Sequence, residues 1–483
     1  MLGRADAAPA PHSALGHTWG QLERMRVELV CFPLVAAVYL THLLVSGYDR
    51  FYYDAGHYWQ LAGRFEVNGH YSLLAYDDVF RGYSIPLLSR DLQAVAAMAG
   101  LGAMTIVKIF GALLAATLGV VVIPRLARRL FPGASISLGR VLALNALIFL
   151  YWRDHFDFPL SDFPALLAAA VGLLGLLRAT ALGYVVAGVG LGLAANMRPA
   201  YLPTVIAALA VAALFPLRPW NLRRRSVAVV LVLAGALVAS MPQTLINHHQ
   251  RGSWSPLIPG GKSIAMLQLT QGMLAQKYET YVGPSAGYPQ PEVAYLDPST
   301  ARVLEEEHVS EITSYGKYAR IVLHHPVRMA ASYVRHIFNG LDVRYPTPYV
   351  RDLGDSSIVL SLLQYTLVFV AIARLLLPEA RRALGRIRWA GVIVLVSPCL
   401  TAIPGAIEPR FFLPLQILIY MLVCFGPATR ASFVEGGLGR RVALAATYAA
   451  FLLVCVSLSS ATLAQIEHPA SALGLGLAGW VRP

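Results

Sequence analysis

Carboxylates and arginines recur beside the apolar runs of this sequence rather than within them. Carboxylates can accept protons, and arginines can bind anions through two parallel N–H donors. Such residues occur in "SGYDRFYYDAGHYW", "HFDFPLSDFPAL", "NMRPAYLP" and "IEPRFFLP". They are Asp49, Asp54, Asp157, Asp162, Arg198, Glu408 and Arg410. Because ionised groups are costly in the middle of a bilayer, this pattern predicts a site at the boundary between membrane and water.

The composition indicates an integral membrane protein. Of the 483 residues, 57% are apolar and 13% are charged, which is far from the composition of soluble domains. The formal charge of +13 comes largely from arginines that follow apolar runs, so membrane topology explains it better than nucleic acid binding does. The four cysteines lie inside apolar runs without paired spacing, and we expect them to be packing residues.

Apolar windows predict an all-α integral membrane protein, a polytopic bundle of about eleven transmembrane helices. The predicted spans are 27–46, 104–124, 136–151, 163–178, 182–197, 200–217, 226–243, 356–376, 390–406, 411–427 and 441–462.

Arginine clusters predict the orientation of this bundle, since basic loops stay in the cytoplasm. The clusters are residues 125–129, 218–225 and 381–388. With that orientation, residues 1–26 form a cytoplasmic tail and 27–463 form the membrane domain. Two large external loops cover 47–103 and 244–355, the first with an interfacial helix near 54–66, and 464–483 form an external tail.

Several short motifs, in this order along the chain, resemble those of the GT-C superfamily of glycosyltransferases that use polyprenyl-phosphate sugars. The motifs are "YYDAGHYWQLA", "RGYSIPLL", "KIFGALLAATLGVVVIPRLARRLF", "SDFPAL", "NMRPAYLP", "NHHQRGSWSPLIPGGKSI" and "EPRFFLP". The likeness covers roughly residues 25–430 and points to the branch of protein O-mannosyltransferases and lipid A aminoarabinose transferases. It implies a GT-C-like fold in the cytoplasmic (inner) membrane, with the active site on the external or periplasmic face.

The resemblance also implies a reaction, in which a sugar moves from a polyprenyl-phosphate donor to a hydroxyl of a glycan, lipid or protein acceptor. Asp54 is expected to be the catalytic base, with Asp162 or Asp49 in reserve. Arg410 and Arg198 are expected to bind the donor phosphate, whose charge grows as its bond to the sugar breaks. The residues expected to bind substrate are Asp49, His57, Tyr58, Arg81, Tyr83 and Glu408.

The chain departs from the family pattern at two positions. Asp54 is followed by Ala55 where many relatives carry a second acid, so no acidic pair supports a metal site, although a divalent metal stays an open alternative. Phe411 stands where relatives commonly have tyrosine. His57 lies one helical turn from Asp54 and could orient it, and an interfacial histidine without that role is an equal alternative.

Two other classes of protein stay open. A polytopic transporter or flippase of lipid-linked sugars would also carry charges at the membrane edge, although the hydropathy pattern contains no visible repeat. A non-catalytic membrane scaffold is the third class, and it is disfavoured because ionisable residues near the bilayer are costly to keep without a use. The sequence names neither the sugar nor the acceptor.

Overall fold

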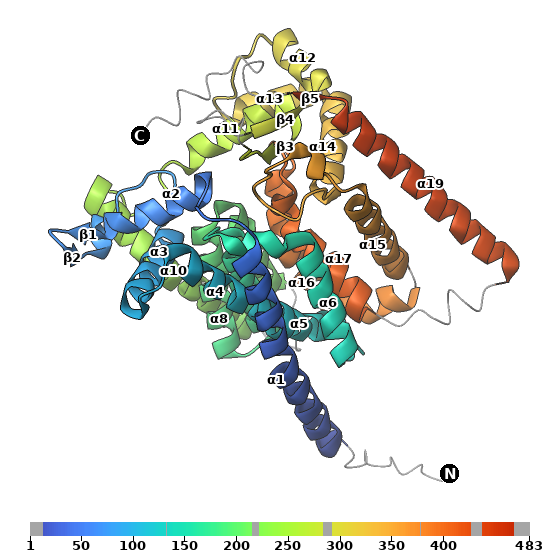
Figure 1. Cartoon of the computed structure of the whole chain (residues 1–483), viewed down its shortest axis with the longest axis horizontal. Coiled ribbons are helices and arrows are strands. Elements are labelled where there is room, and N and C mark those ends of the chain that lie inside the picture. The colour runs from blue at the N-terminus through green and yellow to red at the C-terminus, as the bar shows by residue number, and fades with distance from the viewer. Residues whose placement is uncertain are drawn as a thin grey trace.

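The computed structural model describes residues 13–131, 133–214, 222–283, 292–376, 378–426 and 437–467. Most of these residues are helical, and Figure 1 shows the helices gathered in a bundle with a smaller segment of helices and strands at one end. Most of the predicted external tail and part of the basic stretch 218–225 lie outside the described residues.

A helix lies at each range that the hydropathy pattern predicts as a span. These helices are α1 (Ser13–Val45), α4 (Ala103–Ala116) continued by α5 (Ile123–Leu130), α6 (Leu138–Trp152), α7 (Asp162–Arg178), α8 (Ala181–Met197), α9 (Leu202–Leu214), α10 (Leu222–Arg251), α15 (Ile358–Leu376), α16 (Pro378–Ala402), α17 (Leu413–Phe425) and α19 (Leu438–Leu463). Five helical stretches among the described residues are long and apolar enough to cross a membrane. The chain is therefore a helical membrane protein, and the number of crossings stays a prediction.

Some predicted boundaries differ from the structure. Helix α1 begins at Ser13, inside the range predicted as a cytoplasmic tail, where no proline interrupts the sequence before Pro33. Helix α10 continues to Arg251, past the predicted start of the second external loop at residue 244. A π-helical stretch, Thr117–Val122, joins α4 to α5 without ending the helix.

The predicted first external loop is ordered and packs against the bundle. It contains helix α2 (Tyr53–Leu61), which confirms a helix at the start of the range 54–66, and a 3-10 turn at Ala62–Phe65. A short hairpin of β1 (Glu66–Val67) and β2 (His70–Tyr71) follows. Helix α3 (Ser84–Ala99) then leads back to the bundle.

The predicted second external loop folds into helices around a small antiparallel sheet. The helices are α11 (Gly261–Leu274), α12 (Pro298–Glu306), α13 (Tyr315–His324) and α14 (Pro326–Leu341). Strand β4 (Glu292–Leu296) pairs with β3 (Ala275–Thr280) on one side and with β5 (Ile466–Glu467) on the other. The prediction of an all-α chain omitted these strands, of which only β4 and β5 join segments far apart in the sequence.

Glycines allow α8 to pack closely against α7 and α10. A Cβ on Gly188 would lie 2.0 Å from the carbonyl oxygen of Val232, and one on Gly190 would lie 2.6 Å from that of Ala168. Small residues let helix backbones approach in membrane proteins, where van der Waals packing drives association. This close packing places the first residue of α7 beside the residue that follows α8.

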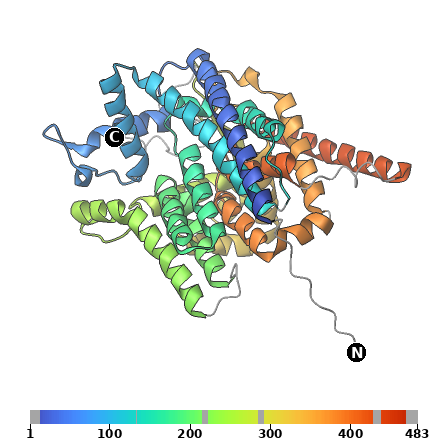
Figure 2. The same ribbon diagram turned by 90° about the horizontal axis from the view of Figure 1, so that it is seen from below.

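Large apolar side chains are exposed on the outside of the bundle. Examples are Leu29 and Val45 on α1, Val230 and Val238 on α10, and Leu453 on α19. In water such surfaces would favour association, whereas lipid solvates them. Helix α19 extends away from the main bundle in both views (Figures 1 and 2), so much of its surface is available to lipid.

The two ends of the bundle differ in character. A Cβ on Gly391 of α16 would contact Leu130, the last residue of α5, and Leu177, in the last turn of α7. The basic residues that close α5 and α7 therefore lie at one end, on the side of the bundle where Gly391 of α16 packs. Asp162 opens α7 at the opposite end. The second-loop helices α11 to α14 lie at the far side of the bundle from the N-terminal end of α1 (Figure 1).

Candidate functional site

Asp54 lies in the first turn of α2, where the backbone is strained. Tyr53 has a φ of 36°, a left-handed conformation that costs free energy for any residue except glycine. The hydroxyl of Tyr349 holds this turn, because it donates to the carbonyl oxygen of Tyr52 at 2.9 Å and accepts from the N–H of Ala55 at 3.1 Å. Tyr349 therefore fixes the direction in which the Asp54 side chain leaves α2.

Arg81 comes from the later part of the first external loop and meets Asp54 from the other side. Asp78 caps the turn before it, since its Oδ1 accepts from the backbone N–H of Arg81 at 2.6 Å. A Cβ on Gly82 would lie 2.3 Å from the carbonyl oxygen of Asn196, so the loop packs directly on the end of α8. Arg81 Nη2 then donates to Asp54 Oδ1.

Asp162 and Arg198 meet where the α7 and α8 hairpin has its open end. Arg198 Nη1 donates to Asp162 Oδ1, and the Asp162 carboxylate is buried. The guanidinium carbon of Arg198 lies 4.8 Å from the ring centroid of Phe411. Phe411 therefore makes a cation–π contact with this arginine. It stands at the position where the resemblance leads one to expect tyrosine.

Arg410 lies in a 3-10 turn, η7 (Pro409–Phe412), that leads into α17. The N–H of Tyr278 on β3 donates to the carbonyl oxygen of Ile407 at 2.9 Å. From the bundle side, Gln416 Nε2 donates to the carbonyl oxygen of Pro409 at 3.1 Å. The small sheet and α17 thus hold this turn from two sides, which fixes the backbone of Arg410.

The Arg410 guanidinium is shared by three carboxylates. Its Nε donates to Glu408 Oε2 and its Nη2 donates to Glu408 Oε1 at 3.1 Å. Nη2 also donates to Asp54 Oδ2 at 3.4 Å, and Nη1 lies 3.6 Å from Asp162 Oδ2. Together with Arg81 and Arg198, these side chains form what we call the arginine–carboxylate cluster, with three formal positive and three formal negative charges.

The members of this cluster differ in their access to solvent. The Asp54 side chain is 32% exposed, whereas the side chains of Asp162 and Glu408 are 2% and 6% exposed. Burial would raise the pKa of the Asp54 carboxyl, but the charges of Arg81, Arg410 and Arg198 outweigh burial and hold that pKa at about 2. Asp54 is therefore an ionised carboxylate at neutral pH, and it is the acid of the cluster that an incoming molecule can reach.

Most of the residues predicted from the sequence for the site lie together. The cluster contains Asp54, Asp162, Arg198, Arg410, Arg81 and Glu408. Tyr58 lies beside it, with its ring centroid 5.3 Å from the guanidinium carbon of Arg81.

Four predicted residues lie apart from the cluster. Asp157 is buried, and its Oδ1 lies 3.5 Å from Lys108 Nζ. The Asp49 side chain is 79% exposed and its Oδ1 lies 3.8 Å from Arg50 Nε. The Tyr83 hydroxyl donates to the carbonyl oxygen of Ala239 on α10 at 3.1 Å. His57 Nε2 lies 3.9 Å from Asp78 Oδ2, and burial together with the charge of Arg81 lowers the pKa of His57.

Sequence reasoning missed two residues that position the cluster. Asp78 is the second acid of "YDDVFRGY", and an aspartate three residues before an arginine and four before a glycine is a turn signal. Tyr349 has no comparable local signal. Its contact with α2 joins residues about 300 positions apart, which only the folded chain reveals.

No cluster of three or more histidine, cysteine, aspartate or glutamate side chains in the described part of the chain has the arrangement of a metal site.

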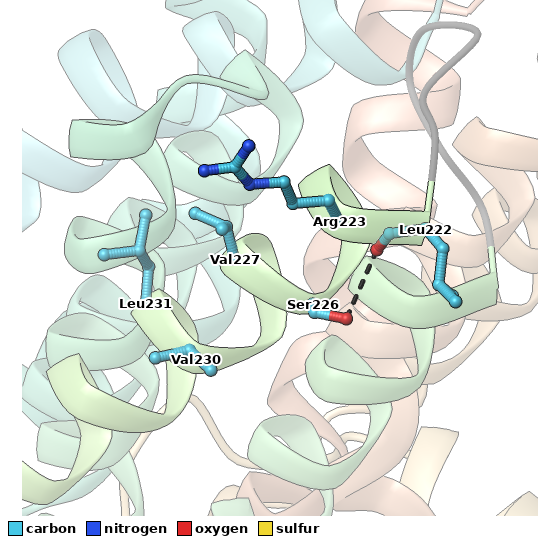
Figure 3. A pocket seen from close by; sticks show the side chains of 6 residues that line it. All are labelled: Leu222, Arg223, Ser226, Val227, Val230 and Leu231. Carbon is cyan, nitrogen blue, oxygen red and sulfur yellow. Dashed lines mark hydrogen bonds between the residues drawn. The ribbon is translucent and has the colours of Figure 1, made fainter.

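A shallow cavity of about 510 Å³ lies on the first turns of α10 (Figure 3). Its lining residues are Leu222, Arg223, Ser226, Val227, Val230 and Leu231. Helix α10 has 30 residues, so at about 1.5 Å per residue its two ends lie about 45 Å apart. The first loop contacts the C-terminal end of α10, where Arg251 bonds to Asp77. The cavity lies at the N-terminal end and is therefore separate from the cluster.

No protein-family model matches this chain, and no curated protein matches it.

Proposed function

We propose that this chain is a membrane glycosyltransferase of the GT-C type. In this proposal it transfers a hexose or pentose from a polyprenyl-phosphate donor to a hydroxyl of a cell-envelope glycan, lipid or protein. The bundle crosses the cytoplasmic membrane about eleven times, and the reaction takes place on the external or periplasmic face.

The observation that carries the proposal is the convergence of three arginines and three carboxylates from distant parts of the chain. They come from α2, the first loop, the open end of the α7 and α8 hairpin, and the turn before α17. This end of the bundle is opposite the basic ends of α5 and α7. A phosphate at headgroup depth, attached to a lipid tail in the bilayer, would meet the arginines there.

The proposed reaction uses both kinds of charge. The acceptor oxygen bonds to C1 of the sugar as the bond from C1 to the phosphate oxygen breaks, and the electron pair of that bond stays on the phosphate. The donor phosphodiester carries one negative charge and the leaving polyprenyl phosphate approaches two, so Arg410 and Arg198 would stabilise the transition state more than the ground state. The acceptor proton goes to Asp54, the most accessible carboxylate of the cluster.

Asp162 is assigned a different role in this proposal. Its carboxylate is buried and pairs with Arg198, so it is suited to holding that arginine against the donor phosphate. Glu408 binds Arg410 through two donors in the same turn and holds it in the same way.

The location of the cluster favours transfer over transport. A flippase would need to accommodate the phosphate near the bilayer midplane, whereas the cluster is built from the ends of α7 and α8 and from loops.

Purified protein should be incubated with a panel of polyprenyl-phosphate sugars and the products identified by mass spectrometry. Release of polyprenyl phosphate together with a free or transferred sugar supports the proposal, and recovery of every donor intact contradicts it.

A further inference from the structure

Each arginine of the cluster is already paired with at least one carboxylate. Glu408 occupies the Nε and Nη2 edge of Arg410, Asp54 also binds Nη2, and Asp162 lies against Nη1. Arg198 is paired with Asp162 and Arg81 with Asp54. A phosphate that approached this neutral arrangement would meet three carboxylates, and binding at Nη2 of Arg410, which Glu408 and Asp54 share, requires that one carboxylate moves away.

The structure indicates which carboxylate can leave most easily. Glu408 and Asp162 are buried, and each has close contact with an arginine. The contact of Asp54 with Arg410 is 3.4 Å long, its side chain is partly exposed, and Arg81 remains as its second partner. Asp54 can therefore give up Arg410 without becoming a buried, unpaired charge, which would be strongly unfavourable.

We propose that donor binding is an exchange at Arg410, in which the donor phosphate replaces the Asp54 carboxylate and thereby releases Asp54 to act as the base. This inference rests on the proposed function of the same site. It makes the base available only in the complex with the donor, since in the free protein Arg410 holds the carboxylate oxygen that would accept the proton.

The electrostatics of the site agree with this exchange. Burial raises the pKa of Asp54, and the charges of Arg81, Arg410 and Arg198 lower it by more. A bound phosphate neutralises Arg410 and Arg198, so the pKa of Asp54 rises from about 2 toward the ordinary value for a carboxyl. A carboxylate with a higher pKa is the stronger proton acceptor.

The test is the affinity for farnesyl phosphate, a short prenyl phosphate, measured by calorimetry in detergent with farnesol as the reference for the tail. Exchange predicts that Asp54→Asn binds farnesyl phosphate more tightly than the wild type, because the competing carboxylate is gone. A carboxylate and a phosphate that share one guanidinium stand roughly 5 Å apart, and at an effective dielectric constant of about 20 their repulsion is worth more than a factor of ten in affinity. We therefore expect a gain of at least about tenfold.

Asp78→Asn is the matched control. Asp78 is a buried acid near Arg81 but has no contact with Arg410, and asparagine keeps the oxygen that caps the turn. Its removal changes the net charge by the same amount, so we expect less than about a threefold gain, since the charge lies farther from the phosphate. If Asp54→Asn does not yield folded protein, Asp54→Ser carries the same test, because it removes the same charge.

Each result has a distinct meaning. Tighter binding by the Asp54 variant alone supports exchange, and so does binding that is detectable only in that variant. Wild-type binding that Asp54→Asn leaves unchanged or weakens overturns exchange and leaves the phosphate site in place. Equal gains in affinity for farnesyl phosphate in both variants overturn exchange, because the change in net charge alone then explains the tighter binding. If no protein prefers farnesyl phosphate to farnesol, the donor site of the proposed function fails, and exchange fails with it.

Discussion

Arg410→Gln should destabilise the protein in a way that depends on pH. The substitution removes the guanidinium that three carboxylates share. Carboxylates on opposite sides of one guanidinium stand about 5 to 6 Å apart, and at an effective dielectric constant of about 20 each pair repels by roughly 3 kcal/mol. Asp54 is partly exposed and screened by solvent, so most of the loss comes from the buried Asp162 and Glu408. We expect a loss of about 3 kcal/mol near pH 7.5, in the range for a broken buried ion pair.

Acidification should reverse part of this loss. The remaining repulsion between carboxylates favours the uptake of a proton by the variant as the pH falls. The bound proton relieves the repulsion, so the variant should recover part of the lost stability, on the order of 1 kcal/mol, between about pH 7.5 and about pH 5. In the wild type, the arginine charges outweigh burial and hold the pKa of Asp54 at about 2. Its stabilising contribution is therefore constant in that window and declines only below about pH 4.

The assay is unfolding in detergent, followed by tryptophan fluorescence at both pH values. Arg64→Gln is the control, because Arg64 forms an exposed ion pair with Asp77 at 2.8 Å, and such pairs contribute less than about 1 kcal/mol. A loss for Arg410→Gln that is the same at both pH values, or no larger than that of the control, would refute the account of the cluster.

Three further predictions concern the surroundings of the site. Tyr349→Phe removes both hydrogen bonds to the start of α2, so hydrogen exchange in that turn should accelerate by about tenfold, and unchanged protection would count against the positioning role. Gly188→Ala places a methyl group 2.0 Å from a backbone oxygen and should cost about 1 to 3 kcal/mol, whereas Gly63→Ala, with no atom within 4 Å, should cost less than about 1 kcal/mol. A cysteine at the exposed position Ser253 should react with an impermeant reagent in intact cells and one at Ser226 only after permeabilisation, and the opposite pattern would invert the predicted topology.

The sequence predicted local features of the fold well because they depend on short stretches. The apolar windows place α7 and α8 within a residue of their observed ends, and a tight turn between two apolar helices makes them neighbours. The pairing of Asp162 with Arg198 lies across the open end of that hairpin. That pairing was not predicted, although both side chains belong to elements that are adjacent in the sequence.

Contacts between distant segments could not be derived in this way. Asp54 and Arg410 are 356 residues apart. Their position beside apolar runs and the resemblance suggested that they share a site, whereas their spacing in the sequence did not. Strand β3 was missed because Lys277 and Glu279 resemble loop residues in the sequence. In the structure both are buried, with Lys277 Nζ 3.0 Å from Glu279 Oε1. Strand β3 forms by pairing with β4, which the pattern within β3 itself does not reveal.

The most direct test of the central claim is sugar transfer per folded molecule by Asp54→Asn. The asparagine keeps the shape of the side chain but cannot accept the acceptor proton, so turnover of a polyprenyl-phosphate sugar should fall by roughly 10²- to 10⁴-fold relative to the wild type. Asp49→Asn should keep wild-type turnover, because Asp49 lies outside the cluster. Wild-type turnover in folded Asp54→Asn protein would contradict the assignment of Asp54 as the base.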